Sequence, residues 1–343
     1  MKTRSYIRLL LCLWLPTISL FAQNTSDVPT AIVIHGGAGT ILKKNMTPEK
    51  EKAIRKVLTA AVEAGHTLLK EGHSSQEAVV AAIRVMEDSP LFNAGKGAVL
   101  NHKGEVELDA SFMDGKTHRA GAITGVQHVR NPIEAAIAVM EASPHVLLAG
   151  AGADAFAQEQ GLAVVEQDYF ITESRKKALK RVQLRQSQSS IPVEKSEDAF
   201  YKNQRYGTVG CVALDSEGNI AAGTSTGGMT NKKWNRIGDA PIIGAGTYAS
   251  NESCGISATG WGEYFIRNVI AYDIAAQMVY GDKSIGEAAA FSIHKRLTSM
   301  GGTGGVIGLD AKGNVLMEMN TPGMYRAAID TNGQLTVKIY ADE

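Results

Sequence analysis

The stretch Tyr206-Gly207-Thr208-Val209-Gly210-Cys211-Val212-Ala213-Leu214-Asp215 places a threonine between a polar segment and an apolar run. The run after it has the composition of a buried strand. Gly207 can adopt backbone angles that other residues cannot, so a strained peptide bond before Thr208 is sterically possible. A threonine whose own amino group is freed by chain cleavage carries its nucleophile and its base in one residue. The stretch therefore predicts a strand that begins at a candidate nucleophile.

Two further threonine-glycine clusters border predicted strands. They are Gly223-Thr224-Ser225-Thr226-Gly227-Gly228-Met229-Thr230-Asn231 and Ser257-Ala258-Thr259-Gly260-Trp261-Gly262-Glu263. Three such clusters indicate that hydroxyl groups gather around one point. Ser225 also matches the Gly-x-Ser-x-Gly string of a serine nucleophile elbow, but a helix must follow that serine. A polar, loop-like segment follows here, which disfavours a serine triad with one of the eight histidines.

The first 22 residues have the pattern of a secretory signal peptide. Lys2, Arg4 and Arg8 precede a mostly apolar run that reaches Ala22, and such a segment is removed from the mature protein. An uncleaved anchor is the alternative, but the run is short for a membrane span and Pro16 interrupts it. We therefore expect a secreted or periplasmic protein with no membrane contact after processing.

The composition restricts the possible partners and cofactors. The 35 basic and 35 acidic residues balance, so no net field attracts nucleic acid or a charged membrane, and a small-molecule substrate is expected. Without the leader, two cysteines remain, Cys211 and Cys254, which could form a bridge or be plain core residues. There is no Cys-x-x-Cys or clustered histidine pattern, so we expect no catalytic metal or other cofactor.

Apolar periodicity predicts an α+β chain of hairpins and long helices. Helices are expected at 48–71, 75–87, 132–142, 148–160, 262–280 and 284–299. Strands are expected at 30–35, 107–115, 120–126, 208–215, 219–224, 253–258, 305–310 and 315–319, with a hairpin turn at 102–104. Residues 174–205 are polar and are expected to form an exposed, mobile loop, with 186–207 as a flexible linker. Antiparallel sheets with helices outside them predict a layered sandwich.

Two short motifs allow more than one interpretation. His35-Gly36-Gly37-Ala38-Gly39 lacks the spacing of a dinucleotide loop and is expected to form a tight turn near the site. Arg236 and Asp239 could clamp the carboxylate and ammonium groups of a zwitterion, because guanidinium pairs with carboxylate and carboxylate with ammonium. The alternative for this pair is a surface ion pair of little energetic value.

Taken together, these motifs resemble the plant-type asparaginase and isoaspartyl peptidase family of N-terminal nucleophile hydrolases. The resemblance runs from Thr30 to Met324, with agreement in order and spacing. The matching stretches are His35-Gly36-Gly37-Ala38-Gly39, Pro90-Leu91-Phe92-Asn93-Ala94-Gly95, Glu107-Leu108-Asp109-Ala110, Gly207-Thr208-Val209-Gly210, Thr224-Ser225-Thr226-Gly227-Gly228, Arg236-Ile237-Gly238-Asp239 and Thr259-Gly260-Trp261-Gly262-Glu263. The family's fold is a four-layer αββα sandwich of two packed antiparallel sheets.

The resemblance implies a role for each matched residue. The precursor would cut itself between Gly207 and Thr208, giving an α chain (23–207) and a β chain (208–343) of one domain. Thr208 would be the nucleophile and Thr226 its activator. The other implied roles are oxyanion stabilisation by Thr259 and Gly260 with help from Asn93, and binding of an L-aspartyl moiety by Arg236, Asp239 and Gly262. The implied structural sodium ion would be bound by the backbone carbonyls of Met86, Glu87, Ser89, Phe92, Ala94 and Lys96.

The implied reaction is hydrolysis of the side-chain amide of L-asparagine and of β-aspartyl dipeptides, by a dimer of cleaved heterodimers. Glycosylasparaginases are one alternative, but they tend to have His-Asp before the threonine, where this chain has Tyr206-Gly207. A binding protein that never cleaves is another. The chain departs from the family at Trp234, Asn235 and Trp261, which are bulkier than usual there, and these departures bear on the leaving group.

Overall fold

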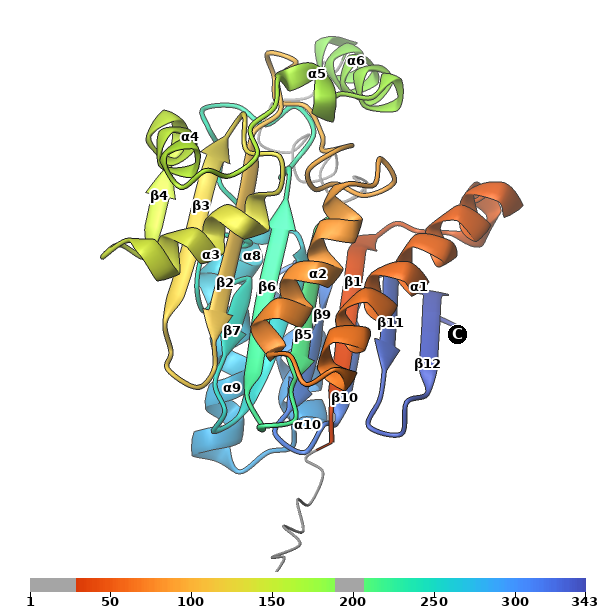
Figure 1. Cartoon of the computed structure of the whole chain (residues 1–343). Coiled ribbons are helices and arrows are strands. Elements are labelled where there is room, and N and C mark those ends of the chain that lie inside the picture. The colour runs from red at the N-terminus through yellow and green to blue at the C-terminus, as the bar shows by residue number, and fades with distance from the viewer. Residues whose placement is uncertain (1–28, 189–206) are drawn as a thin grey trace, which may run out of the picture.

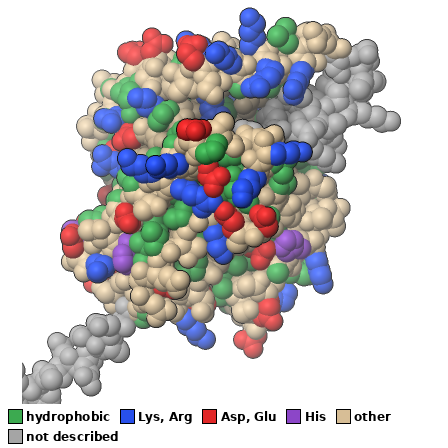
Figure 2. All heavy atoms as spheres, turned by 90° about the vertical axis from the view of Figure 1, so that its right-hand side faces the viewer, with side chains coloured by type: hydrophobic (Ala, Val, Ile, Leu, Met, Phe, Trp, Pro, Cys, Tyr) green, Lys and Arg blue, Asp and Glu red, His purple; other side chains and the backbone are tan. Residues whose placement is uncertain are grey.

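The computed structural model describes residues 29–188 and 207–343. The chain forms two sheets packed face to face, with helices on both outer sides (Figure 1). The predicted signal peptide, and residues 189–206 of the predicted linker, lie outside the described residues. Acidic and basic side chains are interspersed over the face shown in Figure 2, in agreement with the balanced composition.

The larger sheet has eight strands in the order β12-β11-β1-β5-β6-β2-β3-β4, and the smaller has four in the order β10-β9-β8-β7. The strands of the larger sheet are β1 (Ala31–Gly39), β2 (Leu108–Asp114), β3 (Ala120–Val126), β4 (Leu147–Ala149), β5 (Val209–Leu214), β6 (Ile220–Thr226), β11 (Gly323–Ile329) and β12 (Leu335–Tyr340). Those of the smaller sheet are β7 (Thr247–Ala249), β8 (Cys254–Gly260), β9 (Gly304–Asp310) and β10 (Val315–Met319). The predicted antiparallel pairing is confirmed except between β3 and β4, which are parallel.

Helices cover the outer face of each sheet (Figure 1). The larger sheet is covered by α1 (Pro48–Lys70), α2 (Ser75–Glu87), α3 (Pro132–Ala142) and α4 (Gly150–Glu159), and the smaller by α8 (Gly262–Asn268), α9 (Ile270–Gly281) and α10 (Ile285–Ala290). The other helical segments are η1 (Lys43–Asn45), α5 (Gln167–Phe170), α6 (Glu173–Gln188) and the π-helix η2 (Phe291–Leu297). The predicted four-layer αββα sandwich is confirmed.

Strand periodicity divides the core into layers. Ile32 and Ile34 of β1 pack under the helices, whereas Ala31 and Val33 pack between the sheets, because successive side chains of a strand point to opposite faces. The same alternation turns the two cysteine side chains away from each other, each toward the helices that cover its own sheet. Cys211 lies in the helix-side core of the larger sheet, and Cys254 lies in the core between the smaller sheet and its own helices. Both are free thiols, so the open question of a bridge is answered in favour of core residues.

Two helices that cover the larger sheet, α1 and α2, begin where the sequence predicts, whereas α4, predicted from residue 148, begins at Gly150 after the short strand β4. The side chain of Thr47 accepts a hydrogen bond from the Lys50 amide, and Pro48 occupies the first turn of α1. Ser74 and Glu77 form a reciprocal capping box at the start of α2. Each cap satisfies amide groups that have no partner within the helix. The predicted starts of both helices are therefore confirmed.

The prediction of a mobile loop from residue 174 is wrong up to Gln188, because Glu173–Gln188 form α6. The segment consists mostly of Lys, Arg, Gln, Leu and Ala, which are good helix formers. Its single buried side chain is Leu179, which joins the main core. Arg175 fastens the start of the helix, because its guanidinium donates to the carbonyls of Gly97 and Phe92. Few apolar contacts therefore suffice to hold this polar helix.

Other predicted elements differ in detail. The chain ends in four strands rather than two, because β11 and β12 follow β10 and extend the larger sheet beside β1. The predicted hairpin at 102–104 is a turn without flanking strands, closed by Asn101, whose side-chain oxygen accepts from the amides of Lys103 and Glu105. The predicted helix 262–280 is broken at Val269, which has a left-handed backbone (φ 49°). The helix predicted at 284–299 continues as the π-helix η2.

Candidate active site

Thr208 immediately precedes β5 and lies beside Thr226, the last residue of β6. The antiparallel register pairs Val209 with Ser225, so the residues flanking that pair are neighbours at the same end of the sheet. The Thr208 hydroxyl donates to the Thr226 hydroxyl over 3.2 Å. Both side chains are buried. The hairpin between the two strands therefore brings the candidate nucleophile and its candidate activator together.

The carbonyl oxygen of Gly207 accepts two hydrogen bonds at this point. Asn93 Nδ2 donates to it over 2.7 Å, and the Thr226 hydroxyl donates over 3.1 Å. A carbonyl held by two fixed donors is polarised toward attack, because the donors also stabilise the negative charge that develops on its oxygen. Thr208 belongs to the same peptide unit. The uncleaved chain thus presents a nucleophile and an oxyanion site around the predicted scissile bond.

Asn93 is held rigidly in this position. Its side-chain oxygen accepts from the Val99 amide over 2.8 Å, and its Nδ2 also donates to the Gly228 carbonyl over 2.8 Å. The Asn93 main-chain carbonyl accepts from the Gly227 amide. Since both ends of the side-chain amide are bonded, its orientation is fixed. The Asn93 amide is therefore held in the orientation in which it donates to the Gly207 carbonyl.

Thr259 and Gly260 lie at the end of β8, in the other sheet. The Thr259 hydroxyl accepts from the amide of Ala38 in β1 over 3.2 Å, which ties the two sheets together at the site. Gly260 has φ 154°, and a Cβ there would lie 2.5 Å from the Thr303 carbonyl oxygen. Only glycine fits such a close approach. Neither Thr259 nor Gly260 is hydrogen-bonded to Thr208, so their role as oxyanion donors stays a prediction.

Arg236, Asp239 and Gly262 are brought together as predicted, but with a fourth member. Arg236 donates to Glu263 through Nε (2.9 Å) and Nη2 (2.8 Å). Burial lowers the pKa of Arg236, and the bonds and charge of Glu263 more than offset this, so its pKa is raised overall. One edge of the guanidinium fork is therefore already filled by the protein. Only the remaining Nη1 side is left for a ligand carboxylate.

Gly262 opens the space between the two charged groups. A Cβ at this position would lie 2.7 Å from Asp239 Oδ1 and 3.0 Å from Arg236 Nη2. Asp239 is buried, and its Oδ2 has no hydrogen-bond partner within the described part of the chain. Burial raises the pKa of Asp239 to about 7, although the positive charge of Arg236 opposes the rise. A buried carboxylate oxygen without a partner is costly unless a ligand donor satisfies it.

His35 is a site residue whose position the sequence did not predict. The expected tight turn at 35–39 is wrong, because these residues extend β1 with an irregularity between His35 and Gly37. His35 Nδ1 bonds the Thr208 carbonyl at 2.8 Å, and Nε2 bonds the Ser257 hydroxyl at 2.9 Å. Burial lowers the pKa of His35 to about 3, against the opposing effect of the Thr208 bond. The imidazole is therefore neutral and serves to position Thr208.

A chain of buried hydroxyl groups continues from His35 toward the clamp. Ser257 bonds Thr224 at 2.7 Å, Thr224 bonds Thr247, and Thr247 accepts from Ser111 at 2.7 Å. Ser111 lies against the Ala240 carbonyl, directly after Asp239. These hydroxyls are satisfied by one another across the two sheets. The predicted gathering of hydroxyl groups is confirmed, although most of them form a scaffold behind Thr208.

Asp109 is a second carboxylate near the clamp that the sequence left without a role. It lies opposite Thr226 in the β2·β6 register, and its Oδ1 accepts from the Thr124 hydroxyl and the Gly125 amide. Its Oδ2 is buried and without a described partner. Its negative charge acts on both Arg236 and Asp239. The motif Glu107-Leu108-Asp109-Ala110 can be recognised from sequence, but the direction in which the Asp109 side chain points depends on the fold.

The loop predicted to bind sodium is tightly wound. Gly95 has φ 48°, and a Cβ there would lie 2.5 Å from the Glu87 carbonyl oxygen. Among the six predicted carbonyls, those of Met86, Glu87 and Phe92 accept hydrogen bonds from Ser89, Lys96 and Arg175. No group of three or more His, Cys, Asp or Glu side chains that could hold a metal occurs in residues 29–188 and 207–343. The neutral oxygen donors fit a hard cation, and the sodium site stays a prediction.

None of the described helices is long and apolar enough to span a membrane. The predicted signal peptide lies outside the described residues, so the secreted location remains a prediction.

Comparisons with known proteins identify the family to which the chain belongs. The family model described as asparaginase matches residues 28–339. The chain is 47% identical to an isoaspartyl peptidase of Salmonella typhimurium over 86% of this chain and 94% of that protein. It is 46% identical to an isoaspartyl peptidase of Escherichia coli, over 91% and 96%. It is also 39% identical to a probable isoaspartyl peptidase/L-asparaginase 2 of Arabidopsis thaliana, over 90% and 98%. The chain therefore belongs to the asparaginase family.

Proposed function

We propose that this protein is an autoprocessed threonine hydrolase that releases L-aspartate from L-asparagine and from β-aspartyl dipeptides. The observation that carries the proposal is the arrangement at Thr208. Its hydroxyl lies beside Thr226, and the preceding carbonyl is held by Asn93. The names of the relatives, isoaspartyl peptidase and L-asparaginase, support the same substrates.

Self-cleavage comes first in the proposed sequence of reactions. The Thr208 hydroxyl attacks the Gly207 carbonyl carbon, and the Thr226 hydroxyl relays the proton: its oxygen accepts the proton of Thr208 while its own proton moves on to the Thr208 nitrogen. Asn93 Nδ2 and the Thr226 hydroxyl stabilise the negative oxygen of the tetrahedral intermediate. The C–N bond breaks as the Thr208 nitrogen takes up this proton, and an ester links Gly207 to the Thr208 side chain. Water then hydrolyses this ester and leaves Thr208 with a free amine.

Substrate hydrolysis reuses the same threonine. The α-amine of Thr208 accepts the hydroxyl proton, and the oxygen attacks the side-chain carbonyl of the bound aspartyl group. Thr259 and the Gly260 amide stabilise the oxyanion. The leaving group, ammonia or an amino acid, takes the proton, and water then releases aspartate. No metal or other cofactor takes part in these steps.

The clamp explains the choice of an L-aspartyl group. The substrate α-ammonium fits the unpartnered Oδ2 of Asp239, and its α-carboxylate fits the free Nη1 side of Arg236. Gly262 leaves room for the Cα between them. Both charges of the amino acid are thus matched in a buried site, where unpaired charges are costly.

Three further features belong to the same proposal. The signal peptide would direct the protein to the periplasm or the exterior, and two cleaved heterodimers would associate as a dimer. The sodium ion would be held by the carbonyl loop around Glu87, Phe92 and Lys96, where it would fix the loop that carries Asn93.

The function is tested by mass spectrometry and by assay of the same purified protein. We expect chains that correspond to residues 23–207 and 208–343, and aspartate release from L-asparagine and β-aspartyl-leucine. N-acetylglucosaminyl-asparagine is the comparison substrate for a glycosylasparaginase. Thr208→Ala should remain one uncut chain without activity. An intact, inactive wild-type chain would instead indicate a binding protein.

A further inference from the structure

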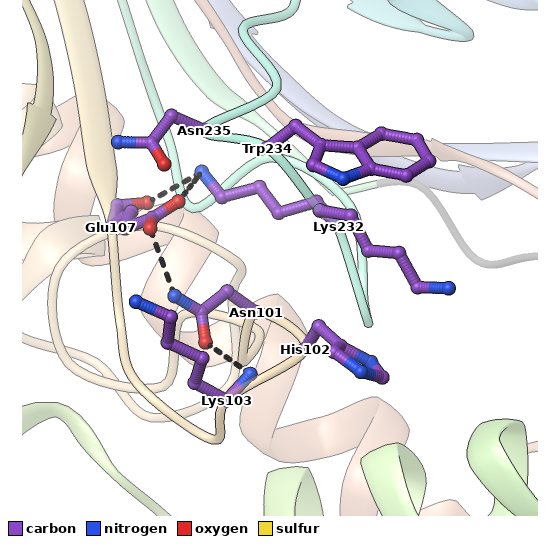
Figure 3. A pocket seen from close by; sticks show the side chains of 8 residues that line it. Asn101, His102, Lys103, Glu107, Lys232, Trp234 and Asn235 are labelled. Carbon is purple, nitrogen blue, oxygen red and sulfur yellow. Dashed lines mark hydrogen bonds and ion pairs between the residues drawn. The ribbon is translucent and has the colours of Figure 1, made fainter.

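A cavity of about 360 Å³ lies next to the active-site loop, and the proposed reaction does not use it. One wall is the segment Lys232–Asn235, the opposite wall is the turn Asn101–Lys103, and Glu107 lies between them (Figure 3). The volume is at the low end of the range of ligand pockets. It suits a single amino acid better than a large ligand.

The floor of the cavity is a closed ion pair. Lys232 Nζ lies 3.4 Å from Glu107 Oε2 and donates to the Glu107 carbonyl over 3.0 Å, and only 2% of the Lys232 side chain is exposed. Asn101 Nδ2 donates to the other Glu107 oxygen over 2.8 Å. The charges of Lys232 and Glu107 are therefore neutralised within the protein. Figure 3 shows the Lys232 side chain reaching Glu107, and the pair leaves the floor of the cavity without net charge.

The rim carries an aromatic ring and cations with no acidic partner. Trp234 is 94% exposed, an unusual degree for an indole, and both Trp234 and Asn235 have left-handed backbones (φ 53° and 55°). Non-glycine residues held in this conformation are strained and gather at functional sites. Lys103 and Lys233 are exposed and form no ion pair in the part of the chain that the structure describes. The rim thus combines a flat apolar surface with positive charge.

The cavity wall connects the nucleophile to the clamp. The Thr226 hydroxyl accepts from the Gly228 amide over 3.0 Å, and the end of the Lys232 side chain packs 3.2 Å from the point where a Cβ of Gly228 would lie. At its other end the wall segment Lys232–Asn235 is followed directly in the sequence by Arg236. The cavity therefore borders the segment that joins the reacting carbonyl site to the aspartyl site.

We infer that this cavity binds the amino acid that leaves from a β-aspartyl dipeptide. The inference rests on the proposed function and adds a site for the part of the substrate that the clamp leaves unbound. The free carboxylate of the leaving residue pairs with Lys103 and Lys233, and its apolar side chain packs on Trp234. L-Asparagine releases ammonia, which has neither group, so its turnover does not depend on the cavity.

The first test compares substrates. Trp234→Ala should lower kcat/KM for β-aspartyl-leucine by about tenfold, since aromatic anchors dominate small contact sites, and should change that for L-asparagine by less than about twofold. Trp234→Phe keeps a flat ring and should retain most of the activity on the dipeptide. Tyr280→Ala removes another exposed aromatic side chain, 80% exposed on α9, and serves as the matched control with no effect on either substrate.

The second test measures binding without turnover. L-Leucine, titrated into the cleaved enzyme, should change the tryptophan fluorescence of the wild type but not that of Trp234→Phe, in which Trp261 remains. L-Leucinamide should bind more weakly because it lacks the carboxylate. Lys103→Gln with Lys233→Gln should remove the difference between these two ligands. Wild-type levels of dipeptide selectivity in Trp234→Ala, or equal binding of both ligands to wild type, would overturn the inference. If neither substrate is hydrolysed, the proposed function fails and the inference falls with it, even if L-leucine still binds. Hydrolysis of both substrates without binding of L-leucine overturns the inference alone.

Discussion

Asn93 Nδ2 lies 2.7 Å from the carbonyl oxygen of Gly207, and this single bond links the asparagine loop to the predicted scissile peptide. The same nitrogen also donates to Gly228, so it cannot turn away without breaking a second bond. After the proposed cleavage the Gly207 carbonyl would become part of a chain end, and the Asn93 amide would be left free to donate to the proposed substrate.

The first prediction follows from this bond. Asn93→Asp keeps the shape of the side chain but replaces the donor with a charge that repels the developing oxyanion. Loss of one oxyanion donor typically costs about 10²–10³ in rate, so self-cleavage should slow by about that factor. The measurement is a time course of the precursor band on a denaturing gel, with Thr208→Ala as the uncut reference. Cleavage of Asn93→Asp at the wild-type rate would remove Asn93 from the oxyanion site.

The second prediction concerns His35. His35→Ala leaves the Thr208 carbonyl and the Ser257 hydroxyl without their bonds, and each unsatisfied buried group costs about 1–3 kcal/mol. We expect the free energy of unfolding to fall by about 2–4 kcal/mol, measured by urea titration of Thr208→Ala backgrounds so that every sample is uncut. Ser257→Ala breaks the contacts of Ser257 with His35 Nε2 and with Thr224, but it keeps the imidazole and its bond to the Thr208 carbonyl, so it should cost less. An equal loss in both variants would mean that the Thr208 contact contributes nothing.

The lowered pKa of His35 also predicts how the stability of the protein depends on pH. Its value of about 3 in the folded chain is below the ordinary 6.5 of the unfolded chain. The unfolded chain therefore binds more protons between these values, and stability falls as pH drops from about 6.5 toward 3. His35→Asn cannot titrate, so its stability should depend less on pH in this window. Thermal melts at a series of pH values measure the difference.

Part of this site could be predicted from sequence because it depends on local pattern. The Thr208–Thr226 pair follows from two consecutive strands joined by the turn at 215–219, which fixes which residues lie opposite each other. The approach of Arg236 to Asp239 follows from their separation of three residues. The start of α2 can also be predicted from sequence, because the side chains of Ser74 and Glu77 accept hydrogen bonds from each other's backbone amides within four residues.

The remainder depends on contacts between distant segments. The Arg236–Glu263 fork joins a loop to the start of α8, 27 residues later, and the Thr208–His35 bond spans 173 residues. Neither pairing has a local pattern. α6 was missed for a different reason: its charged composition is compatible both with a disordered segment and with a helix held by Arg175 and Leu179. Tertiary contacts decide between these two states.

The third prediction is a pH dependence set by Asp239. Its pKa of about 7 means that the carboxyl is neutral at lower pH and cannot pair with the substrate ammonium. We expect kcat/KM for L-asparagine to rise with pH through about 7. The freed amine of Thr208, with an ordinary pKa of about 7.7–8.0, gives a second step in the same direction. Asp239→Asn should lose the lower step, keep the upper one, and lower kcat/KM at pH 8 by about thirtyfold or more.

Stability should respond to the same group with the opposite sign. The folded pKa of Asp239 lies above the ordinary 3.8 of the unfolded chain, so the folded protein binds more protons between about 4 and 7. Its contribution to stability is therefore lost as pH rises through about 7. Asp239→Asn should flatten this part of the curve in thermal melts. An unchanged curve, together with an unchanged kcat/KM profile, would show that Asp239 is ionised throughout.

The last prediction tests the clamp and the part that Glu263 plays in it. The sequence alone suggested that Arg236 would pair with the substrate carboxylate, but Glu263 already occupies two of its donors, Nε and Nη2. Arg236→Ala removes the partner of a desolvated charge, which typically costs about 2–5 kcal/mol, so kcat/KM on L-asparagine should fall about a hundredfold or more. Self-cleavage needs no bound amino acid and should be much less affected.

Two matched variants separate charge from geometry at this position. Arg236→Lys keeps the charge but cannot bond Glu263 and a substrate carboxylate at fixed angles, so it should restore only part of the loss. Glu263→Gln keeps one acceptor for the fork while it removes the charge that fixes Arg236. We expect it to raise KM several-fold with kcat nearly unchanged, because it loosens ground-state and transition-state binding equally. Near-normal turnover of L-asparagine by Arg236→Ala would place the clamp elsewhere, because the α-carboxylate would then be held without Arg236.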